Sequence, residues 1–396
     1  MDITTKFSDK VKHLEASSIR EIFKLLAKPG IISFAGGAPD PNLFPKKEFA
    51  EIAKEILETE GNTALQYGIT EGYAPLREWT KKRLLNQGIL KEEDDVIIVS
   101  GGQQGIDLCS KSLINPGDGV VCEEPSFIGA LNCFRTYGAN LVGVPMDDDG
   151  INIEKLEETI KNNKNIKILY VIPTFQNPSG KTMSLEKRKK LLEICKKNNI
   201  IIFEDNPYGE LRFKGENVPT IKSMDTDNIV MYFGSFSKIL SPGLRVGFTH
   251  GIPEIMAKVI VAKQVNDVHT PVLNQVIASE WMKRYDIDNH ILKAKELYGQ
   301  KCSLMLSEMD KKFPKSVKYT RPEGGLFIWG TLPFGDANEA VKIASEKKVA
   351  FIPGATFMTD LTKTSNCFRL NYSTMSDEKI IEGIDILSKV LSDMYD

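Results

Sequence analysis

The chain has 396 residues, of which 41% are hydrophobic and 26% are charged, and its formal net charge is −2 at pH 7. One hydrophobic core rarely grows to this size, so we expect two lobes. A nucleic-acid partner is disfavoured, because the near balance of charges leaves no basic excess to replace counterions. No apolar run reaches the length of a membrane span, so a membrane partner is not expected either.

The cysteines and histidines lack the spacings of metal sites and disulfide frameworks. Six cysteines include no Cys-x-x-Cys pair, and four histidines form no cluster, which predicts reduced thiols and no metal site. The N-terminus, MDITTKFSDKVKHLEASS, lacks the apolar segment of a secretory signal. We therefore expect a soluble, cytoplasmic protein.

The chain is predicted to begin with an N-terminal arm, residues 1–45. Ser18 and Glu21 have the spacing of a capping box and precede an apolar periodic run. The segment that follows, SFAGGAPDPNLFP at residues 33–45, is too rich in glycine and proline to be regular. We expect it to cross the surface between two domains.

Residues 46–280 are predicted to form a large domain in which short apolar runs alternate with amphipathic ones. The predicted strands lie at residues 95–102, 119–125, 140–147, 166–174, 199–206, 229–235 and 244–251. Helical patterns such as SLEKRKKLLEICKKN, residues 184–198, lie between them. This alternation predicts a mostly parallel sheet covered by helices on both faces.

Residues 281–396 change in character and predict a smaller α+β domain. Strands are expected within residues 318–333, 349–357 and 366–373, and a helix is expected at residues 377–395.

The predicted strand at residues 95–102 ends in two glycines, and a helix is expected to begin at Gln103. Free amides and the positive dipole end at a helix start suit a phosphate group. The segment is neither a Walker A loop nor a GxGxxG motif, and taken alone it is better explained by a plain strand-to-helix turn.

Two polar segments, residues 173–180 and 203–211, follow predicted strands at the sheet edge where ligands bind in open α/β sheets. Asp205 follows an apolar run, so its carboxylate is expected to be partly buried and to need a partner. Taken singly, Asp205 could cap a helix, Tyr208 could be a packing residue, and Asn177 could form a turn.

The segment GSFSKILSPGLRVGF, residues 234–248, places two serines and two cations in one small loop. A lone lysine at Lys238 would be read as a surface residue. Ser235 and Ser237 lie beside Lys238 in the sequence, and Arg245 follows it with a planar guanidinium, so the loop suits a phosphate. Burial and neighbouring cations are expected to lower the pKa of Lys238, as attack on a carbonyl requires.

Together these residues specify a planar, phosphorylated aldehyde whose ring nitrogen needs an anion, which is pyridoxal phosphate. Lys238 supplies the amine and Asp205 the anion. Ser235, Ser237, Arg245 and the amides of Gly102 and Gln103 suit the phosphate.

With these motifs in this order, the chain resembles the class I/II aminotransferases of pyridoxal-phosphate fold type I. It is most similar to the branch that contains 2-aminoadipate and kynurenine aminotransferases. The likeness extends over nearly the whole chain, from SSIREIF and SFAGGAPDPNLFP to PEGGLFIWGTLP and FRLNYS. It implies an α/β enzyme with a mostly parallel seven-stranded sheet in its large domain, and a homodimer with shared active sites.

The resemblance also implies residue roles. Lys238 is similar to the Schiff-base lysine, Asp205 to the partner of the pyridine nitrogen, and Tyr208 and Asn177 to the donors to the phenolic oxygen. Phe127 occupies the place of the aromatic residue that stacks on the ring. The implied phosphate cup comprises Gly102, Gln103, Ser235, Ser237 and Arg245, with Tyr67 from the other subunit.

For the substrate, Arg369 resembles the arginine that grips the α-carboxylate, with help from Asn177. Arg20 and Gly37 match the N-terminal segment that shapes the side-chain pocket. The chain departs from its relatives at Gly102, where a serine is common, and at Phe127, where a tyrosine is common.

The implied reaction moves an amino group from an L-amino acid (aminoadipate, aromatic or other) to a 2-oxo acid such as 2-oxoglutarate, with ping-pong kinetics. Elimination at the β-carbon or decarboxylation stays open, because the motifs report the cofactor better than the fate of the substrate. A cofactor-binding transcription regulator also resembles this branch, but residues 1–32 are expected to be too few for its winged helix.

Overall fold

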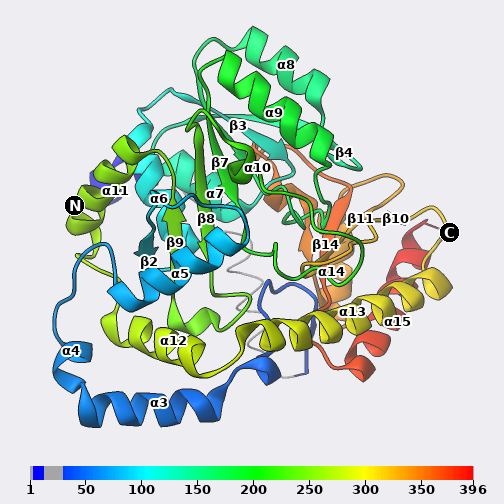
Figure 1. Cartoon of the computed structure of the whole chain (residues 1–396). Helices are drawn as coiled ribbons and strands as arrows, with labels where there is room; N and C mark the ends of the chain where they lie inside the picture. The colour runs from blue at the N-terminus through cyan, green and yellow to red at the C-terminus, as the bar shows by residue number, and fades with distance from the viewer. Residues whose placement is uncertain (1–2, 13–29, 396) are drawn as a thin grey trace.

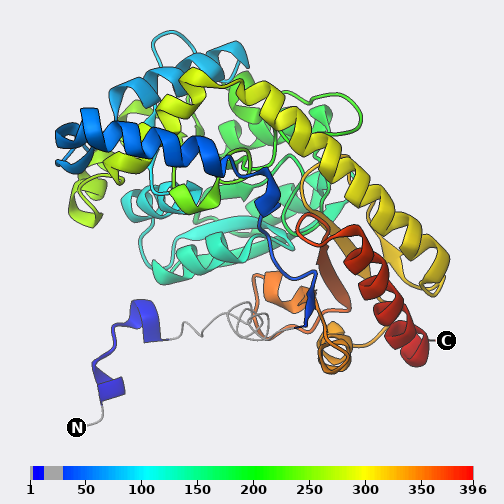
Figure 2. The ribbon, with the colours of Figure 1, turned by 90° about the horizontal axis from the view of Figure 1, so that it is seen from below.

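A computed structural model describes residues 3–12 and 30–395 of the chain. Arg20 and the predicted capping box at Ser18 and Glu21 therefore lie outside the described residues. Figure 1 shows a large sheet in the middle of the molecule and a smaller one, with β11 and β14, beside it. Figure 2 shows residues 3–12 at the margin of the ribbon, away from the C-terminal helix.

The large sheet contains eight strands in the order β2-β9-β8-β7-β6-β3-β4-β5. Strands β8, β7, β6, β3 and β4 are parallel, β9 is antiparallel to both β2 and β8, and β5 forms an antiparallel hairpin with β4. The strands are β2 (Ile97–Val99), β3 (Gly119–Glu124), β4 (Asn140–Asp147), β5 (Gly150–Ile151), β6 (Ile166–Val171), β7 (Ile201–Asp205), β8 (Val230–Ser235) and β9 (Gly247–His250). All seven predicted strands form, and the two-residue β5 extends the sheet.

The central strands are apolar on both faces because both faces are covered. Along β6, Ile168 and Tyr170 join one hydrophobic cluster, whereas Leu169 and Val171 join a second one. The second cluster includes Leu156 of α8 and residues of α9, and these two helices lie side by side at the top of Figure 1. The alternation that places successive side chains on opposite faces therefore divides the core in two.

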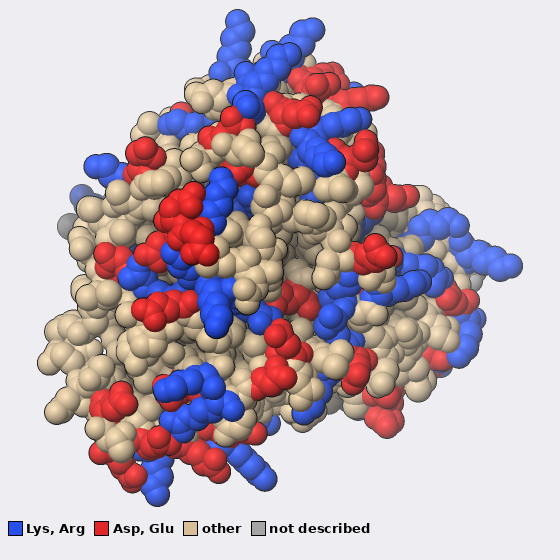
Figure 3. Space-filling model, viewed as in Figure 1, with Lys and Arg blue, Asp and Glu red and all other residues tan. Residues whose placement is uncertain are grey.

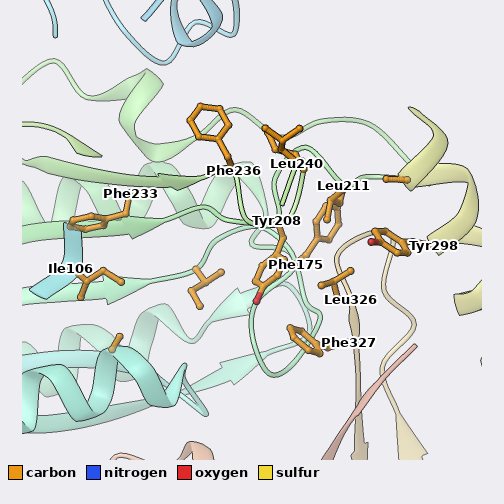
Figure 4. Packing of buried hydrophobic residues seen from close by; sticks show 14 of the residues in the cluster. Ile106, Phe175, Tyr208, Leu211, Phe233, Phe236, Leu240, Tyr298, Leu326 and Phe327 are labelled. Carbon is orange, nitrogen blue, oxygen red and sulfur yellow. The ribbon is translucent and has the colours of Figure 1, made fainter. Parts of the chain in front are cut away.

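The first cluster continues beyond the sheet into the C-terminal part of the chain. Figure 4 shows it running from Ile106 and Phe233 at the large sheet to Tyr298, Leu326 and Phe327. The predicted division at residues 280 and 281 stays a prediction.

The helices predicted at residues 184–198 and 377–395 form as α9 and α15, close to their predicted bounds. The described helices are α1 (Asp9–Lys12), α3 (Lys46–Thr59), α4 (Gly61–Leu65), α5 (Ala74–Asn86), α6 (Gly102–Leu113), α7 (Ile128–Thr136), α8 (Ile153–Asn162), α9 (Leu185–Lys197), α10 (Ile221–Met224), α11 (Pro253–Asn266), α12 (Val272–Arg284), α13 (Ile287–Lys312), α14 (Ala337–Glu346) and α15 (Asp377–Tyr395). Short 3-10 turns occur at η1 (Ile3–Lys6), η2 (Pro41–Leu43), η3 (Pro242–Leu244) and η4 (Gly354–Phe357). Among the described helices, none is long and apolar enough to cross a membrane.

The smaller sheet is antiparallel, in the order β10-β11-β14-β13. Its strands are β10 (Lys318–Tyr319), β11 (Phe327–Thr331), β13 (Ile352–Pro353) and β14 (Cys367–Asn371). Beside it, β1 (Ile32–Ser33) pairs in parallel with β12 (Val349–Ala350). The segment that follows β1 is irregular, as predicted, and Asp40 within it pairs with Lys301 of α13. Acidic and basic side chains are interspersed over the face in Figure 3.

Candidate active site

Three chain segments meet where the parallel strands β6, β7 and β8 end. Because parallel strands have their carboxyl ends at one edge of a sheet, the segments after them are brought together there. Asn177 follows β6, Tyr208 follows β7, and Lys238 follows β8. The amide nitrogen of Asn177 lies 3.5 Å from the hydroxyl of Tyr208. The two polar segments and the serine-lysine loop of the sequence therefore form one cluster.

Lys238 lies in the turn after β8, and its Nζ donates to the carbonyl oxygen of Gly37 at 2.7 Å. Burial of the amine lowers its pKa to about 8, and the positive charges of Arg369 and Arg245 act in the same direction. The charge of Asp205 partly opposes this shift. Lys238 thus holds a larger neutral fraction near pH 7 than an ordinary lysine, as a nucleophilic amine requires.

Asp205 is the last residue of β7 and is 5% exposed. Its Oδ2 accepts a hydrogen bond from the hydroxyl of Tyr170 at 2.7 Å. Burial raises the pKa of Asp205 to about 7, against the lowering effects of Tyr170 and Lys238. Among the described residues, no cation forms an ion pair with this carboxylate, so a cationic ligand atom would meet its need.

Asn177 links Tyr208 to Arg369. Its Oδ1 accepts from Nη1 of Arg369 at 2.8 Å, while its amide nitrogen faces Tyr208. Burial raises the pKa of the Tyr208 phenol, and the charge of Arg369 opposes this rise. Tyr208 is therefore a protonated hydroxyl at neutral pH. Its ring meets Phe327 edge to face, with centroids 5.7 Å apart, as Figure 4 shows.

Arg369 reaches the cluster from β14 of the smaller sheet. Its guanidinium lies over the rings of Phe327 and Phe357, at 4.3 and 5.0 Å from their centroids. Nη2 donates to the carbonyl oxygen of Ala35 at 2.6 Å, and Nε has no described partner. Burial lowers the pKa of Arg369 to about 10, so it stays charged at pH 7. It is a buried cation whose described hydrogen-bond acceptors are neutral.

Glycines shape the seat at the start of α6. Gly101 has φ +82°, and a Cβ there would overlap the guanidinium of Arg245. A Cβ at Gly247 would lie 2.8 Å from the amide nitrogen of Gly102. The helix begins at Gly102, one residue before the predicted start, because Gly101 takes the cap position. The missing side chains allow the loop after β8 to approach the free amides of α6.

Polar groups line the same seat. Ser235 Oγ donates to Ser237 Oγ at 2.9 Å, and Arg245 Nη2 donates to the carbonyl oxygen of Ser100 at 3.1 Å. Arg245 is itself exposed, with a left-handed backbone at φ +52°. Hydroxyls, a guanidinium and helix-terminal amides together make a seat for a phosphate.

Gln103 and Phe127 lie beside each other near this seat. Gln103 Nε2 donates to the carbonyl oxygen of Gly129 at 3.0 Å. A Cβ at Gly129 would lie 2.5 Å from both the Phe127 ring and the Gln103 amide oxygen. Phe127 caps α7 and is partly buried, so its ring flanks the start of α6.

The structure does not bring Tyr67 into the cluster. Its side chain is 80% exposed and meets the ring of His269 edge to face, at 5.8 Å between centroids. Gly37 joins the site through its carbonyl oxygen. Arg20 lies outside the described residues.

The donor set fits pyridoxal phosphate group by group. Lys238 offers an amine of lowered pKa, Asp205 a buried carboxylate that forms no ion pair with a described cation, and the start of α6 a phosphate seat that glycines keep open. The aldehyde, the ring nitrogen and the phosphate of the cofactor require these three features.

Sequence reasoning missed three side chains that touch the site: Tyr170, Phe327 and Phe357. Tyr170 could have been found from strand register, because β6 and β7 pair Tyr170 with Phe203. Asp205, two residues after Phe203, then points to the same face as Tyr170. The stacking of Phe327 and Phe357 on Arg369 depends on packing of β11 and the 3-10 turn η4 against β14, and it leaves no local signal.

Comparisons with known proteins agree over the whole chain. The family model described as aminotransferase class I and II matches residues 32–387. The aromatic-amino-acid aminotransferase 1 of Thermococcus litoralis is 42% identical to this chain over an alignment of 402 residues, and the alignment covers 99% of this chain and 95% of that protein.

Two solved structures are similar in fold and in sequence. A Pyrococcus horikoshii kynurenine aminotransferase, in complex with PMP, superposes with a TM-score of 0.95 at 40% identity, covering 100% of this chain and 99% of the other. An alpha-aminoadipate aminotransferase of Thermus thermophilus, complexed with N-(5'-phosphopyridoxyl)-L-leucine, has a TM-score of 0.91 at 38% identity and covers 100% of this chain and 99% of its own.

Proposed function

Because the chain belongs to the class I and II aminotransferases, which use pyridoxal phosphate, we propose that it moves an amino group from an L-amino acid to a 2-oxo acid through Lys238 and Arg369. One observation carries the residue assignment. These two cations lie in a single buried cluster, and their described hydrogen-bond acceptors are neutral: Gly37 O for Lys238, and Asn177 Oδ1 and Ala35 O for Arg369.

The chain's residues would hold each part of the cofactor. Asp205 pairs with the ring nitrogen, while Tyr208 and Asn177 donate to the phenolic oxygen. Phe127 would lie against the ring. The start of α6, at Gly102 and Gln103, and the side chains of Ser235, Ser237 and Arg245 would hold the phosphate. When bound, the cofactor accepts the amino group at its aldehyde and its protonated ring stabilises negative charge on the substrate's Cα.

Lys238 carries the proton transfer. A pKa of about 8 leaves its Nζ able both to accept a proton from the substrate's Cα and to give it back near neutral pH. Asp205, ionised beside a cationic ring nitrogen, keeps that nitrogen protonated through the transfer.

Arg369 orients the substrate. Its unpartnered Nε and its charge suit the α-carboxylate, which amino acids and 2-oxo acids share. Fixing the carboxylate at Arg369 on one side, with the amino group held at the cofactor's aldehyde on the other, would set the direction of the Cα–H bond toward Lys238. The same contacts therefore serve both half-reactions of a ping-pong cycle.

We propose that the donors are aromatic amino acids or aminoadipate and that 2-oxoglutarate is an acceptor, as the relatives' names suggest. Gly37 and Arg20 would shape the side-chain pocket. We further propose a cytoplasmic homodimer, with domains at residues 46–280 and 281–396. Leu65, Tyr67 and Ile69 form an exposed apolar surface that suits a partner subunit, to which Tyr67 would contribute.

The test uses the wild-type enzyme loaded with pyridoxal phosphate. Single amino acids are first added without an acceptor, and the 2-oxo acid released is measured against the cofactor's absorbance change. Transamination predicts release that stops at one equivalent per subunit until 2-oxoglutarate is added. Continuous release of pyruvate and ammonia without acceptor would instead establish a lyase.

A further inference from the structure

Tyr170 lies in the middle of the large sheet and is completely buried. Its strand neighbours are Cys122 on β3 and Phe203 on β7. Its ring is held edge to face by Phe134, with centroids 5.5 Å apart. From this fixed position its hydroxyl reaches diagonally across β7 to Oδ2 of Asp205, at 2.7 Å.

Among the described residues, only Tyr170 donates a hydrogen bond to the Asp205 carboxylate. A carboxylate at the end of a strand can turn about its last bond, since that torsion is broad. A donor fixed at Oδ2 holds the carboxylate in one orientation and leaves Oδ1 free for a ligand. The donor also stabilises the ionised carboxylate over the protonated acid.

From this geometry we propose that Tyr170 is a positioning residue, which holds Asp205 ionised and oriented so that Oδ1 meets the ring nitrogen of pyridoxal phosphate. This inference rests on the proposed function. Burial raises the pKa of Asp205 to about 7, and the hydrogen bond from Tyr170 opposes that rise. Without Tyr170, more of the Asp205 population would be protonated at neutral pH.

Other titratable groups face the pair from the elements packed around it. They are Lys238 and Tyr232 from β8 and the loop after it, Tyr208 from the loop after β7, and Cys122 and Glu123 from β3. A Tyr170→Phe variant keeps all of these groups, so the ratio of variant to wild-type affinity reports the contribution of the Tyr170 hydroxyl to cofactor binding.

The test titrates pyridoxal phosphate into wild-type and Tyr170→Phe apoenzyme and measures Kd from the visible absorbance between about pH 6.5 and pH 9. Removing a hydrogen bond to a charged group should weaken binding about ten- to hundredfold near pH 7. The ratio of the two Kd values should approach one as pH rises, because Asp205 then ionises in both proteins. Tyr298→Phe is the control, since Tyr298 is equally buried and its hydroxyl accepts from the amide of Asp40 at 3.0 Å.

An affinity ratio that narrows with pH, with Tyr298→Phe unchanged in Kd, supports the inference. Equal affinities for Tyr170→Phe and wild type, with Asp205→Asn still impaired, would overturn it and leave the proposed function intact. A loss that is the same at every pH would also overturn it, as it indicates only a packing defect. If wild-type protein forms no visible band with the cofactor, the proposed function fails as well.

If the Tyr170→Phe variant does not fold, a second measurement tests the inference on a different protein. Site-specific 3-fluorotyrosine at position 170 keeps the shape and makes the phenol a stronger donor. Binding should then extend to lower pH than in wild type, and an unchanged pH profile would contradict the inference.

Discussion

Four cations that are largely removed from water differ in their partners, depending on whether they lie inside or outside the active site. Outside the active site, Lys301 is bonded to Asp40 at 2.6 Å, and Lys263 is bonded to Asp267 at 2.8 Å. In the site, Lys238 and Arg369 are bonded to carbonyl and amide oxygens. All four side chains are removed from water to a large degree, but among the described residues only the first two pair with a carboxylate.

Among these four cations, the difference distinguishes the two that pair with a carboxylate of the chain from the two that an anionic ligand could neutralise. A buried cation without an anion is costly, so a structure that keeps two of them in one cluster favours an anionic ligand there. The lowered pKa values of Lys238 and Arg369 have this origin, since burial is the largest cause of each. A bound phosphate cofactor and a substrate carboxylate would supply the missing negative charge.

Replacing a cation with methionine should lower activity when the cation lies in the site and stability when it lies outside the site. Arg369→Met should lower kcat/KM on the order of 10²- to 10³-fold for amino acids and 2-oxo acids alike, because both carry the carboxylate that Arg369 binds. Steady-state kinetics with each substrate varied in turn measures this. A loss confined to one of the two substrate classes would place the carboxylate elsewhere.

Lys301→Met should instead lower the free energy of unfolding by about 3–5 kcal/mol, because Asp40 is left buried without its cation. Denaturant unfolding of the apoenzyme measures the loss, and kcat/KM of the folded enzyme should stay near the wild-type value. Adding Asp40→Asn should recover part of the stability. Full stability in the single variant would mean that this pair does not hold the fold.

The attachment of the cofactor to Lys238 should depend on pH. The depressed pKa of Lys238 makes the neutral amine abundant above about pH 8, so the rate of attachment to apoenzyme should rise through that pH and then level off. Stopped-flow absorbance measures the rate. A rise that continues to the ordinary lysine pKa of 10.5 would show that the amine is not perturbed.

The smallest effect is expected at the phosphate seat. A Cβ at Gly102 would lie 3.7 Å from the carbonyl oxygen of Gly234, which is ordinary contact. Gly102→Ser should therefore fit and tighten cofactor binding about two- to tenfold through one added hydroxyl. Gly101→Ser is the matched control and should weaken binding, because of its positive φ and its overlap with Arg245. Apoenzyme titration gives both constants, and weaker binding by Gly102→Ser would contradict the predicted seat.

The sequence predicts much of this architecture because its signals are local. Apolar runs of strand length locate all seven predicted strands, and residues 184–198 and 377–395 show helical periodicity. Lys238, Asp205 and Asn177 could be brought together because each follows a strand that ends at the same sheet edge.

The remainder depends on contacts that local patterns do not encode. The bond from Tyr170 to Asp205 depends on the register of two strands separated by α9. The α6 start at Gly102 depends on the left-handed backbone of Gly101. The role of Tyr67 depends on a second subunit, so its exposure in one chain leaves that role a prediction.

The role of Lys238 can be tested by locating the attached cofactor on the chain. Protein loaded with pyridoxal phosphate is reduced with borohydride, which converts an amine–aldehyde linkage into a stable secondary amine, and is then digested and analysed by mass spectrometry. The phosphopyridoxyl group should be found on Lys238, a half-buried lysine that forms no ion pair with a carboxylate among the described residues. Its recovery on another lysine, such as Lys263 or Lys301, would contradict this account of the site.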